Sequence, residues 1–277
     1  MKDEGGRMKK DLDLAQTNHL ASAVHASSGE NALPSSFILQ PSSFRVLLWD
    51  LDGTLLLGTR KGAFKDYTVP MLEAVFGTSG RLPEMTVSGM TDLQIVAEAL
   101  SVAGITREHI AARKDELRER YIKELMRATG NGQQIFAVTP GAREALERVA
   151  AHPRYLSALL TGNIEPAARL KLQIVGLAKF FQTPGAFGDD SFDRRDLPGI
   201  AAQRISKHLG ANLRPEQFIV IGDTPNDIAC ARHFGARVVA VATGRIHTFE
   251  DLRGFKPDAL LRDLSDTELV MRTLDGL

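Results

Sequence analysis

The stretch FRVLLWDLDGTLLLG, residues 44–58, places two aspartates directly after an almost continuous apolar run. The run 44–49 is typical of a strand that is buried on both faces of a parallel sheet. Asp50 and Asp52 are two residues apart, so on an extended chain they point to the same side. Two carboxylates that lie side by side and partly dry do not both ionise without a cation. The pair therefore predicts a cation site at the end of the first strand.

Mg²⁺ fits such a pair, because this hard ion takes a few carboxylate oxygens and keeps water and substrate phosphate as its other ligands. An ionised Asp50 can act as a nucleophile and form an aspartyl-phosphate. Asp52 is a candidate acid/base for the leaving group and then for water. An EF-hand is excluded, because its sixth position would be Leu55 and its twelfth Lys61. A glycosyltransferase metal site and two solvated turn aspartates are the alternatives for the pair taken alone.

Short apolar segments alternate with helical ones after residue 138, which predicts an α/β fold with a doubly wound parallel sheet. The further predicted strands are 155–160, 218–222, 236–241 and the short 258–261. The predicted helices are 140–151, 166–177, 197–210 and 225–235.

The segment between the first strand and residue 138 interrupts this alternation, and it carries no convincing strand. Thr91 is placed to cap a helix over 91–104. Apolar residues recur at helical spacing along 107–130, which predicts further helix there. These patterns indicate a helical cap inserted after the first strand.

We therefore predict a Rossmann-like core of residues 44–57 and 138–277, with residues 58–137 as the helical cap. Residues 1–43 are polar and lack periodicity, and we expect a disordered leader there. A docking segment at Phe37-Ile38-Leu39 is the alternative for this leader.

The composition excludes several classes of protein. The chain of 277 residues carries 34 basic and 34 acidic side chains, and this balance argues against nucleic acid or a membrane surface as the main partner. No apolar run approaches the ~18 residues of a membrane-spanning helix. The single cysteine, Cys230, excludes an internal disulfide and indicates a reducing, cytoplasmic location.

Polar residues follow two of the other predicted strands. In an open parallel sheet the ligand crevice lies outside the carboxyl ends of the strands, so these residues are expected to converge. Thr161 ends one strand and can donate its hydroxyl to a phosphoryl oxygen. Asn163 stands where the cap of the next helix is expected, and backbone N–H groups at such a turn bind anions.

Two more aspartates follow the strand at 218–222. Asp223 comes directly after the strand and is placed as a metal ligand. Asp227 lies in the first turn of the next helix, where a carboxylate also complements the helix dipole. Phosphoryl transfer needs further positive charge near the transferring oxygens, and Arg194 or Arg195 offers it. A charged surface loop is the alternative for this arginine pair.

The segments DLDGT (50–54), LLTGN (159–163) and GDTPND (222–227) resemble the motifs of the haloacid dehalogenase-like hydrolase superfamily, specifically its phosphoglycolate phosphatase-like branch. The resemblance covers about residues 44–270. VSGMTDLQIV (87–96) looks like a cap segment of that branch. The resemblance implies a mobile cap that chooses the substrate and excludes water.

The resemblance also implies a role for each motif residue. Asp50 would be the nucleophile and a Mg²⁺ ligand, and Asp52 the general acid/base with its backbone carbonyl also on the metal. Thr161 would hold the phosphoryl group. Asp223 would complete the metal ligands of the protein, with Asp227 in support. The expected substrate-binding positions are Gly53, Thr54, Gly162 and Asn163.

One position departs from the family pattern, which usually has a lysine before the third helix, often followed by proline. The fitting position here is Arg194, which is followed by Arg195. Arginine keeps the charge but is bulkier and geometrically different, and the sequence leaves open which of the two arginines serves. Lys171 and Lys207 lie inside predicted helices and fit less well.

The second aspartate separates reactions within the family. Halogen removal does not use an acidic residue at the position of Asp52, and phosphonate cleavage usually has alanine there. We therefore predict a Mg²⁺-dependent phosphatase acting on a small phosphorylated metabolite, such as a phosphoglycolate-like compound or a sugar phosphate. The alternatives are a phosphomutase of the β-phosphoglucomutase type and a non-catalytic protein that binds a phosphorylated ligand.

Overall fold

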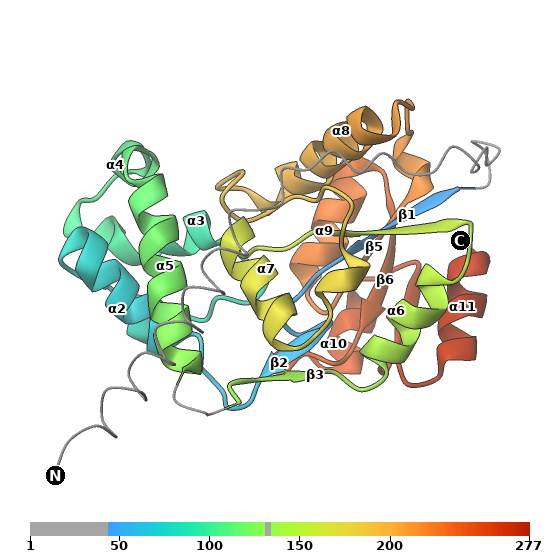
Figure 1. The fold of residues 1–277 in the computed structure, drawn as a ribbon, viewed down its shortest axis with the longest axis horizontal. Coiled ribbons are helices and arrows are strands. Elements are labelled where there is room, and N and C mark those ends of the chain that lie inside the picture. The colour runs from blue at the N-terminus through green and yellow to red at the C-terminus, as the bar shows by residue number, and fades with distance from the viewer. Residues whose placement is uncertain (1–43, 131–133) are drawn as a thin grey trace, which may run out of the picture. The chain divides into compact units, whose positions relative to one another are not determined.

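The computed structural model describes residues 44–130 and 134–277. The predicted leader and its docking alternative lie outside these residues. Five parallel strands form the central sheet in the order β4-β1-β5-β6-β7 (Figure 1). They are β1 (Arg45–Trp49), β4 (Tyr155–Leu159), β5 (Phe218–Gly222), β6 (Arg237–Val241) and β7 (Ala259–Leu261). All five predicted strands are confirmed to within one residue, and β1 lies between β4 and β5.

Helices cover both faces of this sheet, which confirms the doubly wound fold. Leu47 and Trp49 of β1 pack with the helices of one face, and Val46 and Leu48 pack with those of the other. The first face carries α6 (Ala142–Ala150), α7 (Glu165–Ile174) and α11 (Thr267–Asp275). The second face carries α8 (Leu197–Leu209), α9 (Pro225–Phe234) and α10 (Phe249–Gly254).

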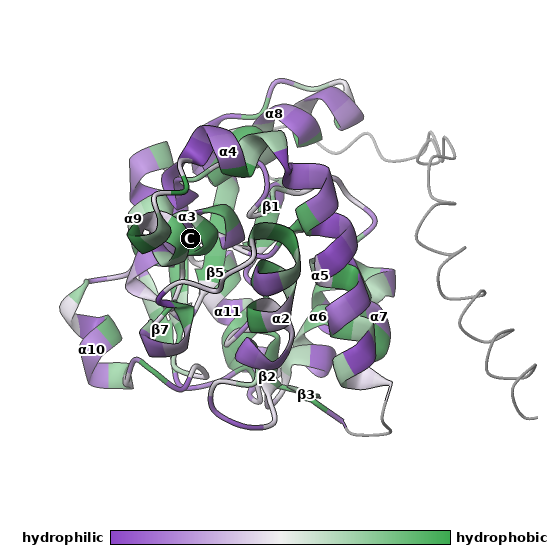
Figure 2. Ribbon diagram, turned by 90° about the vertical axis from the view of Figure 1, so that its left-hand side faces the viewer, coloured by the Kyte–Doolittle hydropathy of each residue, from purple (hydrophilic) through white to green (hydrophobic). Residues whose placement is uncertain are grey.

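The pattern of hydrophobic residues explains this layering. Figure 2 shows that hydrophobic residues predominate in the strands, whereas hydrophilic residues lie along the surrounding helices. All four apolar residues of β1 are fully buried. Each such side chain stabilises the fold by roughly 1.5–3 kcal/mol relative to its exposed state. The apolar run of β1, in which no polar residue alternates with the apolar ones, therefore forms a central strand that is buried on both faces.

The inserted cap consists of helices, as predicted. They are α2 (Lys65–Phe76), α3 (Asp92–Leu100), α4 (Arg107–Ala112) and α5 (Lys114–Thr129), with the 3-10 turns η1 (Leu82–Glu84) and η2 (Ser101–Ala103). Thr91 caps α3 as expected, because its side chain accepts a hydrogen bond from the Gln94 N–H at 3.1 Å. The predicted stretch 107–130 is divided into α4 and α5 at Arg113, whose φ of −111° is not helical.

The expectation that no strand lies between residues 58 and 138 is wrong. β2 (Leu56–Gly58) and β3 (Phe136–Val138) form a two-stranded antiparallel sheet that flanks the cap helices. Leu56 pairs with Val138 in this sheet. Strands of three residues are too short to produce a periodic pattern, so the sequence did not predict them.

The remaining short elements are the 3-10 turns η3 (Ala178–Phe180), η4 (Arg194–Asp196) and η5 (Pro215–Gln217).

Among the residues that the structure describes, no helix combines the length and hydrophobicity needed to cross a membrane.

Candidate active site

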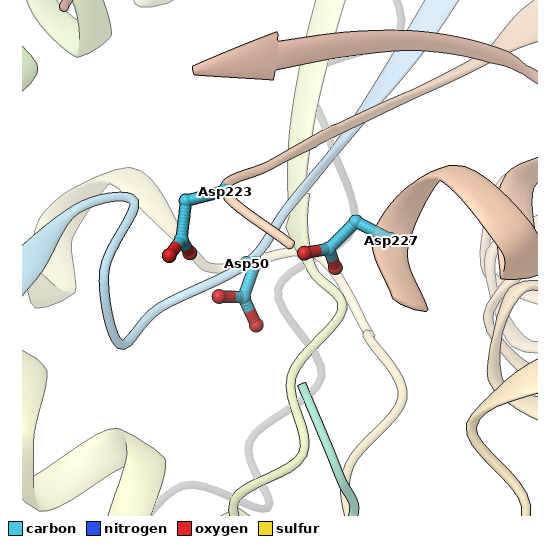
Figure 3. Close-up of side chains that lie close together, drawn as sticks. All are labelled: Asp50, Asp223 and Asp227. Atoms are coloured by element: carbon cyan, nitrogen blue, oxygen red, sulfur yellow. The ribbon is translucent and has the colours of Figure 1, made fainter. Parts of the chain in front are cut away.

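Three aspartates meet at the carboxyl end of the sheet. Asp50 follows β1, Asp223 follows β5, and Asp227 lies in the first turn of α9 (Figure 3). One carboxylate oxygen from each lies within 4.8 Å of the other two, and all three residues are buried. A compact set of oxygen donors of this kind suits a hard divalent cation.

The pKa values of Asp50 and Asp223 indicate that the cluster lacks compensating positive charge. Burial raises the pKa of Asp50 to about 7, against the opposing effect of Arg194 and with a further contribution from the charge of Asp227. Burial and the neighbouring charge of Asp50 raise the pKa of Asp223 well above its usual value. Buried carboxyl groups resist ionisation when they crowd together. The residues present therefore fit a divalent cation, which would compensate their charges.

Arg194 is the arginine that reaches this cluster. Its Nη2 donates to Asp50 Oδ1 at 2.8 Å and also donates to Asp227 Oδ1. Only 6% of its side chain is exposed. The side chain of Arg195 is 60% exposed and pairs with Asp193 outside the cluster. Of the two candidates left open by the sequence, the structure thus brings Arg194 to Asp50.

Asp227 has both of its carboxylate oxygens engaged. Oδ1 accepts from Arg194, while Oδ2 accepts from the Thr224 N–H at 3.0 Å and the Thr224 hydroxyl at 2.6 Å. The bond from the Thr224 N–H, together with that from the Asp227 N–H to Thr224 Oγ1 at 3.3 Å, forms a capping box at the start of α9. Asp227 therefore combines the structural role expected of a helix cap with a place beside the candidate metal-binding carboxylates.

Asp52 lies outside this cluster. Its Oδ2 accepts from Asn163 Nδ2 at 2.6 Å and from Lys171 Nζ at 2.7 Å, and 44% of its side chain is exposed. Asp50 and Asp52 nevertheless line the same cavity. The two aspartates of the opening motif thus have different cationic partners, Arg194 for the first and Lys171 for the second.

The sequence did not indicate the position of Lys171 in the site, because a lysine within a helix was expected to fit less well. The structure places it on α7 with 2% of its side chain exposed. It follows the buried residues Ala167 and Ala168 by four and three positions, so it lies in the apolar stripe of the helix. A lysine in the apolar stripe of a helix was therefore the sequence feature that could have indicated a buried, functional position for Lys171.

Asn163 and Thr54 make contacts that differ from the predicted ones. Asn163 does not cap α7, whose N-cap residue is Ile164, because its amide is turned toward Asp52 and donates to Thr161 Oγ1 at 2.9 Å. Thr54 is fully buried and is not among the residues that line the cavity. Its hydroxyl donates to Asp223 Oδ1 at 3.1 Å, so it contacts a candidate metal ligand.

Two glycines permit close approaches that no other residue allows. Gly53 has a φ of 99°, and a Cβ there would lie 2.3 Å from Asp223 Oδ2. A Cβ on Gly162 would lie 2.0 Å from the carbonyl oxygen of Met90 in the cap. Both glycines line the cavity, so they bring backbone close to the candidate metal ligand and to the cap.

The cavity at this edge has a volume of about 630 Å³ and is lined by both core and cap. The core contributes polar lining residues such as Thr161, and the cap contributes residues such as Tyr67, Val87 and Met90. The backbone N–H of Asp92, in the cap, donates to the Gly162 carbonyl at 2.6 Å. The cap therefore covers the carboxylates and forms most of the apolar wall.

Asp92 also binds the start of α7. Its Oδ2 accepts from the Ile164 N–H at 2.8 Å. Burial raises the pKa of Asp92 to about 7; the Ile164 N–H and Lys171 oppose this shift, whereas Asp52 and Asp189 add to it. The first-turn position at a helix N-terminus suits a carboxylate, but its surroundings favour the protonated form near neutral pH.

We expect Asp92→Asn to flatten the dependence of the unfolding free energy on pH between about pH 4 and pH 7. In this window the unfolded chain releases the Asp92 proton and the folded chain keeps it, so wild-type stability falls as pH rises. The loss from this one group is roughly 2–4 kcal/mol and is complete above pH ~7. Urea unfolding across this range measures it, with the exposed Asp115→Asn as control. Parallel curves for wild type and Asp92→Asn would contradict the prediction.

Residues 47–232 match the family model described as haloacid dehalogenase-like hydrolase, and residues 198–267 match one described as HAD-hydrolase-like. The chain is 27% identical over 225 residues to phosphoglycolate phosphatase of Pectobacterium atrosepticum, covering 81% of this chain and 91% of the relative.

Solved structures share the fold. A predicted phosphoglycolate phosphatase from Haemophilus somnus has a TM-score of 0.55 and 22% identity, covering 83% of this chain and 98% of the other. β-Phosphoglucomutase from Clostridium difficile has a TM-score of 0.58 and 16% identity, covering 84% and 98%. At these identities the likeness extends to the fold alone.

Proposed function

The chain belongs to the haloacid dehalogenase-like hydrolase family, as its motifs predicted, and we propose that it is a Mg²⁺-dependent phosphatase acting on a small phosphomonoester through an aspartyl-phosphate on Asp50. The observation that carries this proposal is the meeting of Asp50, Asp223 and Asp227 with Arg194 at one wall of a cavity that the cap covers. The curated relatives named phosphoglycolate phosphatase support a small substrate. The single buried cysteine is consistent with the predicted cytoplasmic location.

The side chains of Asp50 and Asp223 and the backbone carbonyl of Asp52 would hold the metal, with Asp227 in support. When bound, Mg²⁺ supplies positive charge that compensates the carboxylates and the substrate phosphate. The residues of the chain then need to position the phosphoryl group, attack it and move protons.

The reaction divides into two displacements at phosphorus. In the first, an oxygen of Asp50 bonds to phosphorus while the bond to the leaving oxygen breaks, and Asp52 gives its proton to that oxygen. In the second, Asp52 takes a proton from water while the water oxygen displaces Asp50 from phosphorus. Thr161 donates its hydroxyl to a phosphoryl oxygen, and the Arg194 guanidinium stabilises negative charge at Asp50.

A substrate panel with and without a chelator tests the proposal. With Mg²⁺ we expect hydrolysis of phosphoglycolate, of sugar phosphates or of p-nitrophenyl phosphate. Because the three buried carboxylates need a compensating cation, EDTA is expected to lower the rate more than ~100-fold, and excess Mg²⁺ to restore it. Circular dichroism before and after chelation controls for unfolding.

Two results of this panel would contradict the proposal. No released phosphate from any ester in the presence of Mg²⁺ would favour the non-catalytic alternative. Conversion of β-glucose 1-phosphate to glucose 6-phosphate, without free phosphate, would identify a phosphomutase instead.

A further inference from the structure

Lys171 is a buried cation beside the candidate acid/base. Its Nζ donates to Asp52 Oδ2 at 2.7 Å and to Asn163 Oδ1 at 2.6 Å. The Nζ also lies 5.8 Å from the ring centroid of Tyr67 and 5.3 Å from that of Phe136. The ammonium thus lies among two oxygen acceptors and two aromatic rings.

Stability alone does not account for this lysine. Burying an ammonium costs several kcal/mol, and its partner Asp52 remains 44% exposed to water, which weakens their attraction. An apolar residue of similar length would pack between Tyr67 and Phe136 without that cost. A buried charge that lines a cavity beside a candidate acid/base is a candidate functional residue.

The contacts hold only one of the two oxygens of Asp52. Asn163 Nδ2 donates to the same Oδ2 as Lys171, and Asn163 Oδ1 accepts from Lys171, so the three side chains form a closed triangle. Within residues 44–130 and 134–277, no group donates to Asp52 Oδ1. The triangle therefore holds the carboxylate through Oδ2, and Asp52 is among the residues that line the cavity.

We propose that Lys171 is a positioning residue that, with Asn163, clamps Oδ2 of Asp52 and thereby presents Oδ1 to the leaving-group oxygen and then to water. This inference rests on the proposed phosphatase function. In the first displacement the proton passes from Oδ1 to the leaving oxygen as the P–O bond breaks, and the Lys171 ammonium stabilises the carboxylate that forms. In the second, water gives a proton to Oδ1 while its oxygen bonds to phosphorus.

The cap takes part in this arrangement. Tyr67 belongs to α2 and Phe136 to β3, so two elements at the cap cover the Nζ of Lys171 on the core helix α7. Residues of both the cap and the core therefore surround the ammonium that contacts Asp52.

Lys171→Met tests the proposal through the leaving group. Phosphoglycolate releases a strongly basic alkoxide that needs a proton, whereas p-nitrophenolate leaves without one. We expect kcat/KM of the variant to fall roughly 10²-fold for phosphoglycolate and less than about 5-fold for p-nitrophenyl phosphate. Lys207→Met, at an exposed lysine of α8, is the matched control and is expected to leave both values unchanged. Equal losses for the two esters, or a change in KM alone, would overturn the positioning role.

A double-mutant cycle with Asp52→Asn gives an independent readout. Because Lys171 acts through Asp52, adding Lys171→Met to Asp52→Asn is expected to lower kcat/KM for phosphoglycolate by less than about 3-fold. A further loss of roughly 10²-fold in the double variant would show that Lys171 acts elsewhere. Should Lys171→Met fail to fold, Lys171→Gln keeps a hydrogen-bond donor without the charge, and the same selectivity between esters is expected.

The wild-type rates separate the two proposals. If the wild type hydrolyses both esters and Lys171→Met shows no selectivity, only the role of Lys171 is overturned. If the wild type hydrolyses neither ester with Mg²⁺, the phosphatase function fails, and the role of Lys171 fails with it.

Discussion

Asp50→Asn is expected to lower kcat for phosphate-ester hydrolysis by at least about 10⁴-fold while the protein stays folded. The amide oxygen of asparagine is a poor nucleophile, and it forms no stable phosphoryl ester. The fold should tolerate the change, because Asp50 sits in surroundings that already raise its pKa to about 7. Arg194 keeps Asp227 as its partner.

Two measurements check this expectation. Steady-state rates with phosphoglycolate and p-nitrophenyl phosphate give the loss in kcat, and acid quenching of wild type with radiolabelled substrate traps label on the protein. The Asp50→Asn variant should trap none. Asp115→Asn is the control, since the Asp115 side chain is 88% exposed on α5. Undiminished turnover by a folded Asp50→Asn variant would contradict the nucleophilic role.

Arg194→Met is expected to lower kcat by roughly 10³-fold and the unfolding free energy by about 3–5 kcal/mol. The guanidinium bonds to two buried carboxylates, so its removal leaves Asp50 and Asp227 without that partner in a dry site. Because the proposed divalent cation would bind the same carboxylates in the folded state only, added Mg²⁺ should return part of the lost stability. Urea unfolding with and without Mg²⁺ measures both effects.

Arg195→Met is the matched control for this variant. Its side chain is exposed and pairs with Asp193 beside it, so we expect activity within about 2-fold of wild type and stability within roughly 0.5 kcal/mol. The two variants remove the same charge from neighbouring positions. Equal behaviour of the pair would contradict the assignment of Arg194 to the site.

Much of the fold could be predicted from local patterns. The unbroken apolar runs gave five buried strands within one residue of their observed ends, because a strand buried on both faces has no polar position along it. Thr91 gave the start of α3, because a cap bond joins residues only three apart. The short β2 and β3 were missed, since their pairing joins residues about 80 positions apart and three residues carry no period.

In the candidate site, too, some features could be predicted from the sequence and others required the tertiary structure. By itself the sequence determined which strand ends carry Asp50, Thr161 and Asp223, because parallel strands bring their carboxyl ends to one edge. Only the tertiary structure decided that Arg194 reaches Asp50 and that Lys171 reaches Asp52. Lys171 and Asp52 lie 119 positions apart, and their contact depends on which side of α7 faces the sheet. The apolar stripe of α7 places Lys171 on the buried side of the helix, but the residue that it meets there results from packing the whole helix against the sheet and the cap.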